Sequence, residues 1–137
     1  MIPCLLSVIF GTISTMMIGF YWYSILFCDR YLKEANIKLD KEHELNDQNI
    51  KPLILELSAR FIQASLITYL YSILKIQNER DLGLALSLAV FFCVTFDLQY
   101  YTSKVVWEQK TWNFFFMKVT EQFISLSTLS TIAYIFV

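Results

Sequence analysis

Four long apolar stretches occupy most of this chain of 137 residues, at residues 2–27, 52–74, 82–101 and 112–137. Each has about the roughly 20 residues that a helix needs to cross a hydrocarbon core. Hydrophobic residues make up 56% of the sequence and its mean hydropathy is +0.49, which exceeds what a soluble core uses. Lipid offers no hydrogen-bond partner to unpaired backbone groups, so the stretches should be helices. The sequence predicts an all-α protein, a four-transmembrane-helix bundle formed by one integral membrane domain of residues 1–137.

The basic residues indicate how this bundle is oriented. The charged loop 29–51, in which we expect a short amphipathic or interfacial helix around residues 31–36, carries Arg30, Lys33, Lys38, Lys41 and Lys51. The loop 102–111 carries Lys104 and Lys110. The opposite side of the predicted bundle carries only Lys75 and Arg80. By the positive-inside rule the two loops face the cytoplasm or the mitochondrial matrix, and both termini lie on the same, outer side. We therefore expect a bacterial inner membrane or a mitochondrial inner membrane.

Five ionisable residues lie within the apolar stretches, all toward the basic side: Glu56, Arg60, Asp97, Lys118 and Glu121. At 1.5 Å per helical residue, all five lie within roughly 15 Å of the basic interface. Charges inside a membrane are costly, so we expect this polar intramembrane cluster to face the bundle interior and to pair. The spacings of Glu56 with Arg60 and of Lys118 with Glu121 favour ion pairs within one helix. Asp97 has no such neighbour, so it should reach Arg60, Lys118 or Lys104.

Small residues recur every fourth position on two of the stretches. They form a helix-packing stripe of Ser7, Gly11, Thr15 and Gly19, and a second stripe of Ala85, Ala89 and Cys93 that leads to Asp97. Stripes of this kind let helix backbones approach closely in membranes. Hydroxyl groups on the last helix, such as those of Ser125, Thr128 and Thr131, should bond to backbone carbonyls or to neighbouring helices.

Three uses of the polar cluster remain open. It can be a salt-bridge network that fixes helix register, with Tyr23 and Gln122 completing its hydrogen bonds. It can line a polar cavity that opens to the basic side and binds a small solute, a lipid headgroup or a proton. It can also bind a partner subunit.

Several classes of function are disfavoured. The chain has no Gly-rich phosphate loop, HExxH or GxSxG motif, and its one histidine, His43, falls in the charged loop. The cysteines Cys4, Cys28 and Cys93 have neither metal-ligand nor disulfide-framework spacing. We therefore expect a protein that is not an enzyme, with no catalytic residues, no metal and no cofactor. A net charge of −1 does not suggest binding to nucleic acid.

The leading hypothesis is a structural or accessory subunit of a membrane complex or of a homo-oligomer. Its partners would be the lipid bilayer and either other membrane subunits or further copies of the chain. The alternative is a small-solute or ion channel or carrier that uses the polar cluster.

Two segments carry a family resemblance. The run from Gly19 to Phe27 resembles the G-x-x-W-Y-S-P-x-x-F signature of a bacterial membrane family, domain of unknown function 1761, and the run from Trp107 to Trp112 resembles its F-E-G-R-P-W segment. Ile25 and Thr111 replace the two prolines of those patterns, and Cys28 stands where glycine is usual. The resemblance implies a four-helix membrane protein without an established activity. The matching positions define a family-signature surface of Trp22, Tyr23, Ser24, Glu108 and Trp112, whose aromatic residues can equally serve as interfacial anchors.

Overall fold

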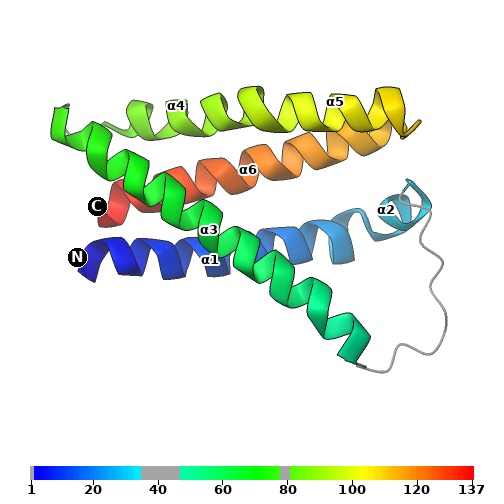
Figure 1. Ribbon diagram of the computed structural model, residues 1–137, viewed down its shortest axis with the longest axis horizontal. Coiled ribbons are helices and arrows are strands. Elements are labelled where there is room, and N and C mark those ends of the chain that lie inside the picture. The colour runs from blue at the N-terminus through cyan, green and yellow to red at the C-terminus, as the bar shows by residue number, and fades with distance from the viewer. Residues whose placement is uncertain (1, 35–46, 78–80) are drawn as a thin grey trace.

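The computed structural model describes residues 2–34, 47–77 and 81–137, and almost all of these residues are helical (Figure 1). The elements in chain order are α1 (Ile2–Tyr21), the π-helix η1 (Trp22–Leu26), α2 (Cys28–Glu34), α3 (Asp47–Gln77), α4 (Leu82–Phe92), the π-helix η2 (Cys93–Asp97), α5 (Leu98–Trp107) and α6 (Trp112–Phe136). The described residues include no β-strand. The predicted all-α class is therefore confirmed.

Three helical segments are long and apolar enough to cross a membrane, judged by length and composition. They are Cys4–Leu26, Leu53–Leu74 and Leu82–Trp107. The fourth predicted span corresponds to α6, which has 25 residues and is not one of these three. These three segments are compatible with a membrane protein.

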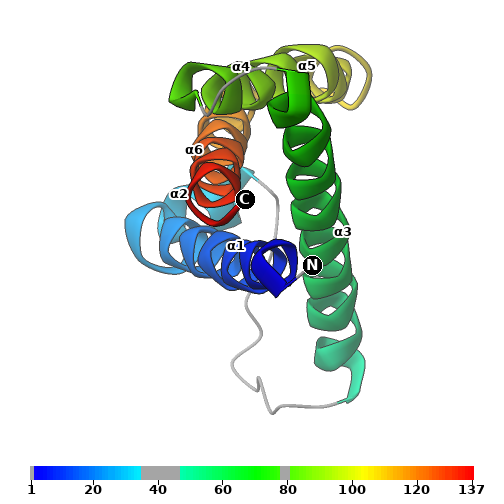
Figure 2. The same cartoon turned by 90° about the vertical axis from the view of Figure 1, so that its left-hand side faces the viewer.

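The helices surround α6, which packs against α1, α3 and α4. Figure 1 shows α1, α6 and the α4–α5 helix running along the long axis, while α3 crosses them obliquely. Viewed nearly end-on, α6 lies between α1 and α4, and α3 passes along the side of all three (Figure 2). The two termini lie at one end of the molecule, and α2 and the α5–α6 connection lie at the other (Figure 1).

The small-residue stripe on α1 lies where that helix meets α3 and α6. Ser7 and Thr15 are almost completely buried, and the Ser7 hydroxyl lies 3.0 Å from that of Thr68 on α3. A Cβ atom at Gly11 would lie 2.7 Å from Cδ2 of Leu129, so a larger residue would push α6 away. On the other side of α6, Ala85 and Ala89 are fully buried in the same core. Small side chains thus bring α1 and α4 close to the central helix.

The loop predicted over residues 102–111 is shorter in the structure. Residues 102–107 continue α5, so the prediction of a loop over 102–111 is wrong for them. No glycine or proline interrupts this part of the chain, and the helix ends at Trp107. Gln109 then adopts a left-handed conformation with φ 54°, and the hydroxyl of Thr111 accepts a hydrogen bond from the Phe114 N–H at 3.1 Å to cap α6.

The charged loop predicted over residues 29–51 also contains helix at both of its ends. Within the described residues, the short helix expected around residues 31–36 corresponds to α2, and the prediction of a loop is wrong for residues 47–51, which begin α3. Its remaining basic residues, Lys38 and Lys41, and the histidine His43 lie outside the described residues, as does Arg80 in the other connection.

Candidate functional site

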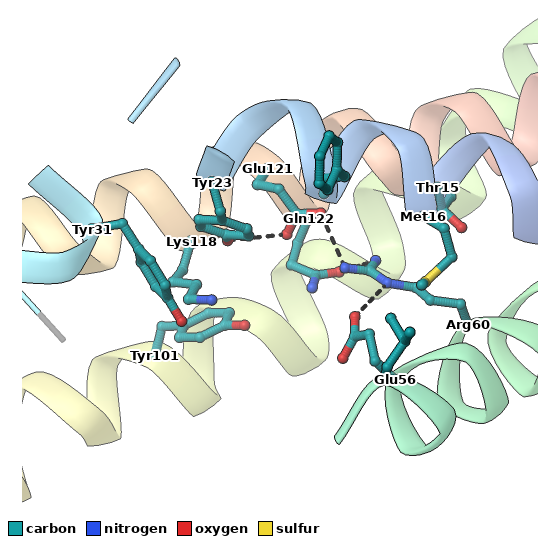
Figure 3. Close-up of a pocket in the computed structure, with 13 residues that line it drawn as sticks. Thr15, Met16, Tyr23, Tyr31, Glu56, Arg60, Tyr101, Lys118, Glu121 and Gln122 are labelled. Carbon is teal, nitrogen blue, oxygen red and sulfur yellow. Dashed lines mark hydrogen bonds and ion pairs between the residues drawn. The ribbon is translucent and has the colours of Figure 1, made fainter. Parts of the chain in front are cut away.

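Arg60 on α3 lies at the centre of the polar cluster and is only 6% exposed. Its Nε donates to Oε1 of Glu56, one turn earlier on α3, at 2.9 Å. Its Nη2 donates to Oε1 of Glu121 on α6 at 3.0 Å, and its Nη1 donates to Oε1 of Gln122 at 3.4 Å (Figure 3). Every nitrogen of the guanidinium group therefore has an acceptor. We call these four residues the Arg60 network.

The carboxylate of Glu121 is completely buried and has several donors. Besides Arg60, the hydroxyl of Ser125 donates to Oε1 at 2.9 Å, and the hydroxyl of Tyr23 on η1 donates to Oε2 at 3.4 Å. A charge is tolerated at this depth only when it is paired and hydrogen-bonded. The hydrogen bonds predicted for Tyr23 and Gln122 are both present.

The hydroxyls farther along α6 behave as predicted with one exception. Thr128 and Thr131 donate to the carbonyls of Ile124 and Ser127. Ser125 instead donates to the Glu121 side chain on its own helix, since that carboxylate is the stronger acceptor.

Lys118 is surrounded by aromatic rings. Its Nζ lies 4.1 Å from the ring centroid of Tyr23, 4.8 Å from that of Tyr31 and 5.9 Å from that of Phe114. Within the described residues it forms no ion pair, so the prediction that it pairs with Glu121 is wrong. Its side chain extends toward α2 and η1 (Figure 3), where ring faces stabilise the ammonium group.

These side chains line a cavity of about 410 Å³ between α1, η1, α2, α3, α5 and α6, which we call the network cavity. Its charged and phenolic lining comprises Tyr23, Tyr31, Glu56, Arg60, Tyr101, Lys118 and Glu121. Gly19 on α1 leaves room beside the ion pair, because a Cβ atom there would lie 3.8 Å from Oε1 of Glu121. Burial raises the pKa of Tyr31 on α2, and the nearby charge of Glu56 raises it further. The Tyr31 phenol therefore stays protonated at neutral pH and can donate a hydrogen bond into the cavity.

Asp97 lies at the end of η2 in a second, more apolar cavity of about 580 Å³, which we call the Asp97 groove. Its apolar lining includes Leu66, Phe92, Phe96 and Leu126. Glu56, Arg60 and Gln122 line both cavities, so the Arg60 network forms the wall between them. All five residues of the predicted cluster therefore lie in these two adjoining cavities.

The prediction that Asp97 pairs with Arg60, Lys118 or Lys104 is wrong. In the described part of the chain its carboxylate has no ion pair and no hydrogen bond. Arg60 already donates from all its nitrogens, and Lys118 extends toward Tyr23 and Tyr31. Lys104 pairs with Glu108 at the other end of α5. Arg60 and Glu121 reach Asp97 only through longer-range electrostatic interactions.

The family-signature surface divides between the cavity and the exterior. Tyr23 lines the network cavity, whereas Ser24 and Glu108 are exposed and Trp112 is 57% exposed. Trp22 packs on Phe27 with ring centroids 4.8 Å apart, and its buried indole nitrogen has no hydrogen-bond partner within the described residues.

Tyr31 and Tyr101 also line the network cavity but were not predicted as site residues, because the prediction rested on ionised side chains within the apolar stretches. A signal existed for Tyr101, which is one helical turn beyond Asp97.

Among the residues that the structure describes, no group of three or more His, Cys, Asp or Glu could hold a metal ion. The three cysteines are free.

Comparison with known proteins gives a family but no activity. The sequence model of the family described as "Protein of unknown function (DUF1761)" matches residues 6–134. No curated protein and no solved structure matches the chain.

Proposed function

This chain belongs to the DUF1761 family, and from its geometry we propose that it is a non-enzymatic membrane protein that binds a small polar solute in the network cavity and carries it across the bilayer. The cavity carries the proposal. It is large enough for a small solute, and it has fixed charges of both signs, with tyrosine rings, in a helical bundle. Intramembrane ionisable residues of this kind mark solute pathways in transporters.

The proposed topology has four spans, with α6 as the fourth. Its two ionisable side chains, Lys118 and Glu121, face the interior of the bundle, where aromatic rings contact Lys118 and Arg60 pairs with Glu121. Arg30 and Lys33 on α2, and Lys110 in the α5–α6 connection, lie at the same end of the molecule (Figure 1). By the positive-inside rule that end faces the cytoplasm or matrix, and both termini face outward in a bacterial or mitochondrial inner membrane.

Flux through proteoliposomes tests this function. Lactate, glycine and choline serve as an anionic, a zwitterionic and a cationic probe of the cavity. We expect at least one to leave loaded proteoliposomes faster than it leaves protein-free liposomes. Lys118→Met should abolish that difference, and Lys104→Met, a matched change at a lysine outside both cavities, should preserve it. Equal leakage of all three probes from both kinds of liposome would reject carriage by this cavity.

A second candidate function, an accessory subunit or homo-oligomer, is favoured by the first part of α3. All seven residues from Leu53 to Ala59, about two helical turns, are exposed. Leu53, Glu56 and Ala59 also line the two cavities, so the uncovered face of these turns is the opposite one. In Figure 1 this part of α3 projects away from the other helices. A second membrane helix could pack on one face while lipid covers the other.

Cross-linking in lipid tests the second candidate. In a background without the native cysteines, Leu55→Cys should form cross-linked dimers with a bifunctional maleimide. Met17→Cys is the control, because Met17 is 66% exposed and Leu55 is 70% exposed. Monomers alone from Leu55→Cys would argue against self-association through this part of α3.

A further inference from the structure

In the described part of the chain, four members of the predicted five-residue cluster have a partner: Glu56, Arg60 and Glu121 form ion pairs, and Lys118 lies over aromatic rings. The carboxylate of Asp97 has no ion pair and no hydrogen bond there. It is about half-buried in the Asp97 groove, among Leu66, Phe92, Phe96 and Leu126. A carboxylate in such apolar surroundings is unfavourable unless a cation accompanies it or a proton neutralises it. The chain's own cations that were expected to pair with it are engaged elsewhere.

We infer that the Asp97 groove is a binding site for hydrophobic organic monocations. The volume of about 580 Å³ lies within the range of small-molecule sites. Asp97 supplies the opposite charge. The rings of Phe92 and Phe96 stack with centroids 5.7 Å apart, and they offer apolar area and ring faces for a delocalised cation.

The backbone supports the assignment. Asp97 ends the π-helix η2, where the Leu98 N–H bonds to the carbonyl of Cys93, five residues earlier. Short π-helical segments inside longer helices occur frequently at functional sites. Ala85, Ala89 and Cys93 are buried where the preceding turns pack in the core, so this wall of the groove is anchored.

A hydrophobic cation fits the groove better than a lipid acyl chain. An acyl chain would cover the apolar lining but would leave the carboxylate unpaired. A small hydrated cation would pair with the carboxylate but would leave the phenylalanines unused. Binding here does not depend on carriage through the network cavity, from which the Arg60 network separates it.

Two ions of the same shape and opposite charge test the site. The full chain in mild detergent is titrated with tetraphenylphosphonium and with tetraphenylborate, and binding is followed by calorimetry. We expect saturable binding of the phosphonium only. Loss of the Coulombic attraction in Asp97→Asn should weaken phosphonium binding by at least about tenfold. Glu108→Gln, the same change at an exposed carboxylate, should leave it unchanged.

A second variant keeps the carboxylate and fills the groove. Leu66 is 46% exposed at the groove, so Leu66→Trp should be accommodated by the fold and should also weaken binding. Wild-type protein that fails to bind the phosphonium saturably, or that binds both ions equally, would overturn the inference. So would an Asp97→Asn variant with wild-type affinity. None of these results bears on carriage through the network cavity.

Discussion

Nη2 of Arg60 lies 3.0 Å from Oε1 of Glu121, and this buried ion pair joins α3 to α6. Only 7% of the Arg60 side chain and 1% of the Glu121 side chain are exposed. Replacing Arg60 with Met leaves an unpaired carboxylate inside the bundle. We expect Arg60→Met to lower the free energy of unfolding by about 3–5 kcal/mol, as for other broken buried pairs. Unfolding by SDS titration in mixed micelles measures the change.

The double variant Arg60→Met, Glu121→Met separates the cost of an orphaned charge from the worth of the pair. Because it removes both charges, we expect it to recover most of the stability lost in Arg60→Met. Lys104→Met, which breaks the more exposed pair with Glu108, is the control and should leave the unfolding midpoint unchanged. An Arg60→Met variant as stable as the wild type would show that the ion pair does not hold α3 on α6.

The two glycines of the α1 stripe should respond to alanine in opposite directions. A Cβ atom at Gly11 would lie 2.7 Å from Leu129, which is 3% exposed and has little space to move. At Gly19 the nearest contacts would be 3.8 and 3.9 Å, which are ordinary distances. We expect Gly11→Ala to destabilise by about 1–3 kcal/mol through overpacking. Gly19→Ala should stabilise by up to about 1 kcal/mol, because alanine favours the helix.

Thermal unfolding in one detergent compares the two alanine variants directly. Opposite shifts of the midpoint are expected. Equal destabilisation would mean that both glycines are needed for close packing, and equal stabilisation would mean that α1 and α6 can move apart without loss.

Local spacing predicted the parts of the site that depend on a single helix. Glu56 and Arg60 are four residues apart, and helix geometry alone brings them together. The same argument failed for Lys118 and Glu121. Their pairing competes with contacts from Lys118 to the rings of Tyr23 on η1 and Tyr31 on α2, and the Tyr31 contact exists only because α2 packs beside α6. Spacing along one helix carries no information about that choice.

Asp97 shows the second limit of the sequence. A charge with no partner on its own helix was expected to find one across the bundle. Whether it does depends on which acceptors take the nitrogens of Arg60, and on the π-helical turn at Cys93–Asp97. Hydrophobic periodicity reveals neither feature. The apolar lengths predicted the helical class and four spans, and three of the four correspond to segments long and apolar enough to cross a membrane, because those properties follow from composition.

The ring of Tyr23 should matter more than its hydroxyl. The ring centroid lies 4.1 Å from Nζ of Lys118, whereas the hydrogen bond to Glu121 is long, at 3.4 Å. We expect Tyr23→Leu to lower the free energy of unfolding by about 1–2 kcal/mol through loss of the cation–π contact. Tyr23→Phe keeps the ring and should lose less than about 1 kcal/mol. Unfolding by SDS titration distinguishes them, and an equal loss in both variants would assign the effect to the hydroxyl.

Thiol labelling in sealed vesicles tests whether the proposed topology is correct. Lys33 on α2 and Glu108 before α6 are exposed at one end of the molecule, and Leu82 at the start of α4 is 42% exposed at the other end (Figure 1). In a background where Cys4, Cys28 and Cys93 are replaced by Ala, a membrane-impermeant maleimide added to right-side-out vesicles should label Leu82→Cys at once. Lys33→Cys and Glu108→Cys should react only after permeabilisation, because the positive-inside rule places their end in the lumen. If Glu108→Cys reacted from outside while Lys33→Cys did not, α5 and α6 could not both span, and the four-span arrangement would be wrong. If all three reacted equally in intact vesicles, the bundle would lie on the membrane and not across it.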